Sequence, residues 1–505
     1  MIDLTEHDYI QGYARSVEAL SHSPGNKDFQ HQAVLSLART GSLDLALLEY
    51  ERYGLDKIRN HEDIMALGGR LSKDLYLRAL RHGDDANAKQ FAQNAAHQYE
   101  AAFQDTKGYY SGINAATMAF LADMPQDIVL GRVQAILDIL PPTEKLTSQD
   151  HYFIEATRAE CFILSGHIDK ATDSLKSAIN FDPLNYTAHA ATVKQFKMIL
   201  RKRGEPDDWL YIFSPPCAIH YAGHIELGLS KAESESLCIS VSDHLQKYDI
   251  GFGYGALAAG SDIIIAEALI QEGAELHVIL PCATDIFVEH SVRPFGEEWV
   301  SRFRTCLEAA RSVKNLTASE NWPSLLLNQL CARIAMGQAV LKSQYFGTPA
   351  AQLLIWNGEK SRSYTAHHAQ DWEQTGKTQI ILPLKKSGPS ANKTEAPAHD
   401  VDILLQRSDM AAITAYKTAP EAAQAALDIQ AQNMDVQIGL HVNLPGSNAD
   451  MKLSALTNQA MPNGILLSEA MASLLAYQDQ IEFNVNFAGF TTDSEGNVLR
   501  SYALA

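Results

Sequence analysis

The sequence predicts a multidomain protein in which an all-α helical-repeat region, an α/β region with a parallel sheet and a small α+β region follow one another. Residues from about 5 to 203 carry helical patterns with few strand-like runs. Strands and helices then alternate as far as Leu384, which indicates a parallel sheet covered on both faces. A stretch rich in Pro, Ser, Ala and Lys separates this region from the last hundred residues.

These patterns fix the expected boundaries of the domains. We expect a helical scaffold over 1–203, an α/β domain over 208–387, a linker over 388–399 and a last domain over 400–505. A chain of 505 residues is too long for one ordinary core, which agrees with several domains.

Composition and charge exclude several classes of partner. The chain has 41 Lys and Arg against 60 Asp and Glu, a formal net charge of −19 that repels nucleic acid and anionic membrane surfaces. Its apolar runs are shorter than the roughly 18 residues that span a bilayer, and its N-terminus lacks a secretory pattern, so a cytoplasmic location is expected. The six scattered cysteines form no CxxC pair and predict no metal site and no disulfide framework.

The helical region contains the spacing of a tetratricopeptide repeat. Small residues stand where two antiparallel helices cross, a glycine lies in the turn between them and a proline ends the second helix. The diagnostic copy consists of Ala159, Gly166, Ala171, Leu175, Ala178 and Pro183. An earlier copy repeats the separation of five residues with Gly41 and Ala46.

The segment "YYSGINAATMAFL" (Tyr109 to Leu121) lies in the same region. It resembles a signature of the TRAF-binding regulatory region of the apoptosis-signal-regulating kinases and of its bacterial relatives. The resemblance covers roughly the first 200 residues and implies a tetratricopeptide-like scaffold that binds a protein partner. Gly112 and the alanines of the segment permit close helix contact, so we expect it to pack rather than to catalyse.

Two glycine turns follow the first two predicted strands of the α/β region. The first is Gly223-His224, and the second runs through Gly253, Tyr254 and Gly255 to Gly260, where a helix opens at Ser261. In an open parallel sheet, ligands bind beyond the carboxyl ends of the strands, where helix N-termini favour anions. The glycines either let the backbone approach a phosphate or only make tight turns and helix–sheet contacts.

The same stretch resembles the SLOG superfamily of Rossmann-like domains. The resemblance covers roughly Ser214 to Leu384 and implies a domain that binds a nucleotide or a nucleotide-derived ligand. The matching positions, and therefore the expected ligand-binding residues, are Gly223, His224, Gly253, Tyr254, Gly255, Gly260, Asp262, Trp356, Asn357 and Gly358.

Some SLOG domains cleave N-glycosidic bonds, a reaction that needs a carboxylate. The candidates are Glu267 and Asp262, on the helix that opens at the glycine turn. Asp262 lies in the first turn, where helix capping also explains an acid. The Pro-Gly-Gly-x-Gly-Thr turn of the hydrolytic relatives is absent, so ligand binding without turnover is favoured.

The last domain resembles half of a class III nucleotidyl cyclase. The resemblance rests on "VQIGLHVNLPG", on "PNGILLSEAMASLLA" and on a hairpin that carries Ser408 and Asp409. Cyclases use two metal-binding aspartates and a transition-state arginine. Of these three residues, only the second aspartate has a counterpart here, which is Asp409. We therefore expect a degenerate, truncated domain without cyclase activity, in which a homodimer interface is a natural remnant.

Taken together, the patterns predict a signalling or regulatory protein. Its SLOG-like domain senses a nucleotide-type ligand without a required cofactor, and its helical repeats recruit a protein partner. An N-glycosidase acting on a nucleoside or NAD-type substrate is the alternative, and a pure interaction scaffold is the third reading.

Overall fold

The computed structural model describes residues 8–143, 150–225, 227–318, 323–359, 363–384, 401–444, 447–478 and 483–505. The chain divides into two compact units, residues 8–215 and residues 216–505, and each is described by itself. The predicted linker over 388–399 lies outside the described residues.

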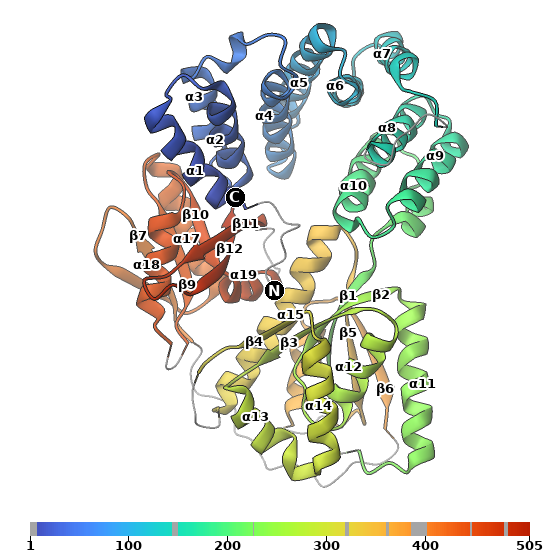
Figure 1. The fold of residues 1–505 in the computed structure, drawn as a ribbon, viewed down its shortest axis with the longest axis vertical. Coiled ribbons are helices and arrows are strands. Elements are labelled where there is room, and N and C mark those ends of the chain that lie inside the picture. Colours follow the sequence, from blue (N-terminus) through green and yellow to red (C-terminus); the bar gives the residue numbers. More distant parts are fainter. Residues whose placement is uncertain are drawn as a thin grey trace. The chain divides into compact units, whose positions relative to one another are not determined.

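The first unit is helical, as predicted, and its helices follow one another along an arc (Figure 1). Its α-helices are α1 (Tyr9–His22), α2 (Lys27–Arg39), α3 (Leu43–Arg52), α4 (Glu62–Arg81), α5 (Asp85–Thr106), α6 (Tyr109–Leu121), α7 (Gln126–Ile139), α8 (His151–Leu164), α9 (Ile168–Phe181) and α10 (Tyr186–Arg203). A 3-10 segment, Asp208–Phe213, follows and places Leu210 and Phe213 in the core of this unit. No helix in the described part of the chain is long and apolar enough to cross a membrane.

The tetratricopeptide spacing corresponds to the hairpin of α8 and α9. Ala159, Ala171 and Ala178 are fully buried, so the small side chains let the two helices approach closely. Gly166 has a φ of 79°, a left-handed conformation that glycine adopts without strain in the turn between the helices. The earlier copy has the same construction, with a buried Ala46 and a left-handed Gly41. The helical repeats are therefore confirmed.

The crossing at Ala171 leaves no room for a larger side chain. Ala171→Leu should overpack it and lower the free energy of unfolding by about 1–3 kcal/mol. Urea unfolding measures the loss, with Lys176→Leu, at an exposed position of the same helix, as the control. Wild-type stability of Ala171→Leu would contradict the close crossing.

The second unit begins with a six-stranded sheet in the order β4-β3-β2-β1-β5-β6, in which every neighbouring pair is parallel. Its strands are β1 (Cys217–Gly223), β2 (Ile250–Gly255), β3 (Glu275–Leu280), β4 (Ser312–Asn315), β5 (Ala350–Trp356) and β6 (Thr378–Pro383). The sequence predicts five of these strands and misses β4, which is a short, polar and largely exposed edge strand.

Helices cover both faces of this sheet (Figure 1). They are α11 (Lys231–Lys247), α12 (Ser261–Gln271), α13 (Thr284–Ser291), α14 (Glu297–Ala309), α15 (Leu325–Phe346) and α16 (Tyr364–Glu373). Side chains alternate along β2: Phe252 contacts Phe346 of α15, whereas Gly253 lies against Leu269 of α12. The strand order reverses between β1 and β5, which makes their carboxyl ends the switch point of the sheet.

A mixed sheet in the order β11-β12-β10-β9-β7-β8 completes the second unit. Its elements are β7 (Ile403–Arg407), β8 (Ile413–Tyr416), α17 (Ala419–Gln432), β9 (Ile438–Val442), α18 (Ala449–Gln459), β10 (Ile465–Ser468), α19 (Glu469–Tyr477), β11 (Val485–Thr492) and β12 (Val498–Leu504). Only β9 and β10 pair in parallel. The predicted fold class, with helical repeats, a parallel α/β sheet and a small α+β region, is confirmed.

The two sheets of this unit share a helical layer formed by α15 and α19. A Cβ atom on Gly337 of α15 would collide with the backbone carbonyl of Ser473 in α19, so the two helix backbones touch. The hydroxyl of Tyr477 donates to the carbonyl of Asp371 at 2.9 Å, and Lys314 forms an ion pair with Glu469.

The imidazole of His441 on β9 is 3% exposed, and neither ring nitrogen has a hydrogen-bond partner among the described residues. Burial, and next the charge of Lys452, lower its pKa to about 3. In the unfolded chain this imidazole is protonated below pH ~6.5, whereas in the folded chain it stays neutral down to about pH 3. The free energy of unfolding therefore decreases as the pH falls from ~6.5 towards 3.

His441→Leu should therefore raise the free energy of unfolding by about 1–3 kcal/mol at pH 7, because it removes two buried polar atoms that lack partners. The gain should be larger at pH 5 than at pH 7. Urea titrations at both values measure it, with the exposed His97→Leu as the control. A variant less stable than the wild type at both values would show that the imidazole has a partner.

Candidate functional site

The carboxyl ends of β1 and β5 bring together two segments that the sequence singles out separately. Gly223 and His224 end β1, and Trp356, Asn357 and Gly358 end β5, at the switch point of the parallel sheet. Adjacent crossovers leave on opposite faces at such a point, which opens a crevice between the two strand ends. We refer to these five residues as the switch-point site.

Hydrogen bonds hold the switch-point site in one geometry. The Nε2 atom of His224 lies 3.1 Å from Oδ1 of Asn357, so the two side chains contact each other across the switch point. The amide of His224 donates to the carbonyl of Ile355 at 3.2 Å, and the carbonyl of His224 accepts from the amide of Ser261 at 3.1 Å. The hydroxyl of Thr365 donates to the carbonyl of Gly223 at 3.0 Å. Strands β1 and β5 and the starts of α12 and α16 are thereby tied together.

Four of the predicted ligand-binding glycines have a packing partner where a Cβ atom would stand. Gly253 lies against Leu269 of α12, Gly255 against the ring and carbonyl of Tyr221, and Gly223 against Ser261. Gly260 has a φ of 95° and lies against the carbonyls of His224 and Ile225. These positions need glycine for close packing against a helix at Gly253 and Gly223, against strand β1 at Gly255 and against a loop at Gly260, whereas their contact with a ligand stays a prediction.

Gly358 differs from the other glycines, because no atom of the described residues lies within 4 Å of the place where its Cβ would stand. Tyr254 differs in another way. Its side chain is buried on the opposite face of β2 from Gly253, and its ring stacks on His277 with centroids 4.5 Å apart. The structure therefore places Gly358 just beyond the end of β5 and the ring of Tyr254 against His277 of β3.

Asp262 lies in the first turn of α12, as predicted, and is 8% exposed. Its carboxylate accepts hydrogen bonds from the amide of Ala258 at 3.1 Å and from the amide of Gly223. Burial raises the pKa of this carboxyl to about 7, although the two amide donors act in the opposite direction. The side chain thus fastens the β2–α12 turn to the end of β1.

Glu267, the second predicted catalytic carboxylate, faces α14. Its two oxygens accept from Nε and Nη2 of Arg302 at 2.8 and 2.6 Å, a bidentate ion pair. The same guanidinium lies over the ring of Trp299, with the carbon 4.1 Å from the ring centre. The structure does not bring Glu267 together with Asp262.

The structure adds two side chains to the switch-point site that the sequence analysis missed. Ser261 opens α12 with a buried hydroxyl oxygen that has no hydrogen-bond partner among the described residues, and Thr365 fixes the carbonyl of Gly223. The Nε1 atom of Trp356, at the end of β5, is also buried and has no hydrogen-bond partner among the described residues. A serine directly after a glycine turn is a visible signal, but Thr365 becomes relevant only through the folded chain.

Asp409, the remaining cyclase-like aspartate, lies on the surface. It forms a bidentate ion pair with Arg407, with distances of 2.8 and 2.6 Å. Strand β7 pairs directly with β8 and β9. Within the described ranges, no group of three or more His, Cys, Asp or Glu side chains is arranged to hold a metal ion.

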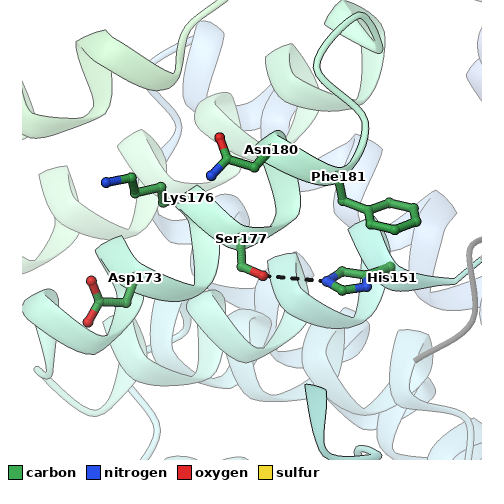
Figure 2. A pocket seen from close by; sticks show the side chains of 6 residues that line it. All are labelled: His151, Asp173, Lys176, Ser177, Asn180 and Phe181. Atoms are coloured by element: carbon green, nitrogen blue, oxygen red, sulfur yellow. Dashed lines mark hydrogen bonds between the residues drawn. The ribbon is translucent and has the colours of Figure 1, made fainter. Parts of the chain in front are cut away.

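A shallow pocket of about 460 Å³ lies on α9 and the start of α8 in the helical unit (Figure 2). The ring of His151 stacks on Phe181 at 4.2 Å, and its Nε2 lies 3.4 Å from the hydroxyl of Ser177. Asp173 and Lys176 lie at its other end. None of the residues predicted from the sequence lines this pocket.

Comparison with known proteins supports the assignment of tetratricopeptide repeats in the helical region. A family model described as Tetratricopeptide Repeats-Sensor matches residues 10–119. No curated protein matches the chain. The resemblances of the second unit to SLOG and cyclase domains stay predictions, since no comparison tests them.

Two solved structures illustrate the low similarity at which the chain aligns with known folds. A mutant O-GlcNAc transferase from Thermobaculum terrenum aligns at 11% identity over 64% of this chain and 75% of its own, with a TM-score of 0.18. LpoA from Haemophilus influenzae aligns at 10% identity over 97% and 95%, with a TM-score of 0.17. At these TM-scores the alignments carry no argument about fold or function.

The raised pKa of Asp262 makes a test of the site's electrostatics. Because the folded pKa of about 7 exceeds the unfolded value of ~3.9, the native state binds the extra proton, and this contribution to stability is lost as the pH rises towards and through 7. The wild type therefore loses stability from pH 5 to pH 8, whereas Asp262→Asn, which does not titrate, does not. The stability difference between variant and wild type should shift in favour of the variant by roughly 1–4 kcal/mol over this range.

Urea unfolding at both pH values measures this difference. The matched control is Asp285→Asn, an exposed aspartate in the first turn of α13. A stability difference between Asp262→Asn and the wild type that stays constant across this range would mean that the carboxyl ionises normally.

Proposed function

We propose that this chain is a sensor in a signalling pathway, in which the switch-point site binds a nucleotide-type ligand and the helical repeats bind a protein partner. The contact of His224 with Asn357 at the switch point carries the first part of this proposal. The match of residues 10–119 to a sensor family of tetratricopeptide repeats supports the second, since such repeats are built for protein interaction.

The chemistry of the switch-point site suits a ligand with phosphate and hydroxyl groups. The N-termini of α12 and α16 lie beside the site, and backbone amides at helix N-termini attract anions. His224 and Asn357 offer donors and acceptors for sugar hydroxyls or base edges. Gly358 leaves open space, and the buried Ser261 hydroxyl and Trp356 indole donor lack partners among the described residues.

Hydrolysis of an N-glycosidic bond is the alternative, and the carboxyl of Asp262 is the observation that favours it. A carboxyl with a pKa of about 7 is suited to exchange protons near neutral pH. Two considerations weigh against it: Asp262 accepts two backbone amides, and Glu267 is engaged by Arg302. Binding without turnover is therefore the better supported function.

A ligand screen tests the proposal. Purified full-length protein is titrated with NAD, ADP-ribose, ATP and GTP by calorimetry, and the reaction is followed for release of the base. Saturable binding without turnover supports sensing, and turnover that is lost in Asp262→Asn supports the alternative. No binding by any of the four compounds would overturn the nucleotide assignment.

For a ligand found in this way, His224→Ala and Asn357→Leu should each weaken binding at least tenfold, or about 1.4 kcal/mol, because each removes a polar contact at the switch point. Glycines of β2 make poor probes, since a side chain at Gly255 would collide with the carbonyl of Tyr221. His97→Ala, in the helical unit, serves as the control. Wild-type affinity in both variants would place the ligand elsewhere.

A further inference from the structure

A chain of polar side chains joins four helices of the helical unit. The ammonium group of Lys73 on α4 donates to Asn114 of α6 at 3.2 Å and to Gln195 of α10 at 3.1 Å. Gln195 in turn donates to Glu160 of α8 at 2.9 Å, and the hydroxyl of Thr117 donates to the same carboxyl oxygen. The helices of the repeat therefore meet over a polar surface at this place rather than over an apolar core.

Three cations gather beside this chain. Arg70 and Lys73 lie one turn apart on the same side of α4, and Arg39 ends α2, which packs on α4. Arg70 forms an ion pair with Asp74, with 3.1 Å between Nε and each carboxylate oxygen. The Nε atom of Arg39 is buried without a hydrogen-bond partner in the described part of the chain.

The ion pair with Asp74 neutralises Arg70, whose pKa is raised despite burial, whereas the charges of Lys73 and Arg39 are incompletely compensated. Burial and the neighbouring Arg70 lower the pKa of Lys73 to about 8, and the same two causes lower that of Arg39. Burial raises the pKa of Glu160, which weakens it as a counter-charge. Lys73 donates its two identified hydrogen bonds to neutral amides. Partly buried like charges of this kind destabilise a fold unless a bound group compensates them.

We propose that Arg39, Arg70 and Lys73 form an anion-binding site in the helical unit, which takes the phosphate or carboxylate groups of a small molecule or peptide. Guanidinium groups bind such oxyanions with paired hydrogen bonds, and an ammonium adds a point charge. The side chain of Arg70 keeps 26% of its surface exposed, so a ligand can reach it. The exposed ring of Tyr110 lies beside it and packs edge to face, at 6.3 Å, on the fully buried ring of Tyr99.

This site is separate from the switch-point site, and its existence does not depend on the function proposed above. It also gives a role to the segment "YYSGINAATMAFL", which supplies Tyr110, Asn114 and Thr117 to this surface. The alanines of the segment are buried and pack, as predicted.

Thermal unfolding of the full chain in low salt, with pyrophosphate or a tetraglutamate peptide added, tests the proposal. Either anion should stabilise the wild type in a saturable manner. Stabilisation by pyrophosphate alone identifies a phosphate ligand, and stabilisation by the peptide alone identifies a carboxylate one. Absence of both effects would overturn the site.

Arg39→Gln is the decisive variant, because the buried Nε atom that it removes has no hydrogen-bond partner among the described residues, although the guanidinium also lies over the ring of Tyr9, 5.9 Å from the ring centre. It should stay folded without the anion and should bind the anion at least tenfold more weakly. Lys73→Gln, which keeps an amide donor for Asn114 and Gln195, should show the same loss and decides the matter if Arg39→Gln does not fold. Undiminished anion binding in the folded variants would refute the assignment.

Two controls locate the effect. Lys176→Gln removes an exposed cation from the shallow pocket of Figure 2 and should bind the anion as the wild type does. His224→Ala alters the switch-point site and separates anion binding there from binding in the helical unit: stabilisation that persists in His224→Ala and is lost in Arg39→Gln locates the anion in the helical unit. If His224→Ala abolishes the stabilisation and Arg39→Gln does not, the anion binds at the parallel sheet and the helical site is wrong.

Discussion

Helix α15 is the element on which the second unit depends. Its 22 residues carry buried side chains on every side, so this helix is stable only when it is covered all round. The parallel sheet covers one side through β1, β2, β3 and β5, and α19 covers the other. Gly337 allows the backbones of α15 and α19 to touch at Ser473. The mixed sheet is thus required to complete the core of the parallel one, and the two sheets form one compact unit.

This arrangement connects the switch-point site with the mixed sheet through one short helix. Thr365, at the start of α16, holds the carbonyl of Gly223, and Asp371, near its end, accepts from Tyr477 of α19 and pairs with Arg333 of α15. Because interiors are closely packed, a shift of α16 at the switch point must be accommodated at Tyr477. Helix α16 therefore contacts the switch-point site at one end and α19, which packs on the mixed sheet, near its other end.

The sequence predicts the parts of this protein that local patterns determine. The α8–α9 hairpin follows from the spacing of Ala159, Gly166 and Ala171, and the parallel sheet follows from alternating strands and helices. The pairing of Glu267 with Arg302 has no local signal, because the residues are 35 positions apart. The glycines of β2 are ambiguous for a physical reason: close packing and ligand approach both require the absence of a Cβ atom, and only the folded chain reveals Tyr221 and Leu269 beside them.

Several buried polar groups in this molecule cost stability, and burial cost alone does not identify a site. His441 is 3% exposed and lacks hydrogen-bond partners among the described residues, yet its burial leaves a ligand no access. Arg70 lies beside two further positive charges, and its side chain is 26% exposed, so solvent and solutes reach it. At the switch point the Ser261 hydroxyl is fully buried as well, but His224 and Asn357 are half-buried and Gly358 is exposed, so a ligand can reach the site. Buried polar groups that cost stability, together with access for a ligand, distinguish the two candidate sites from a core residue such as His441, which has the cost without the access.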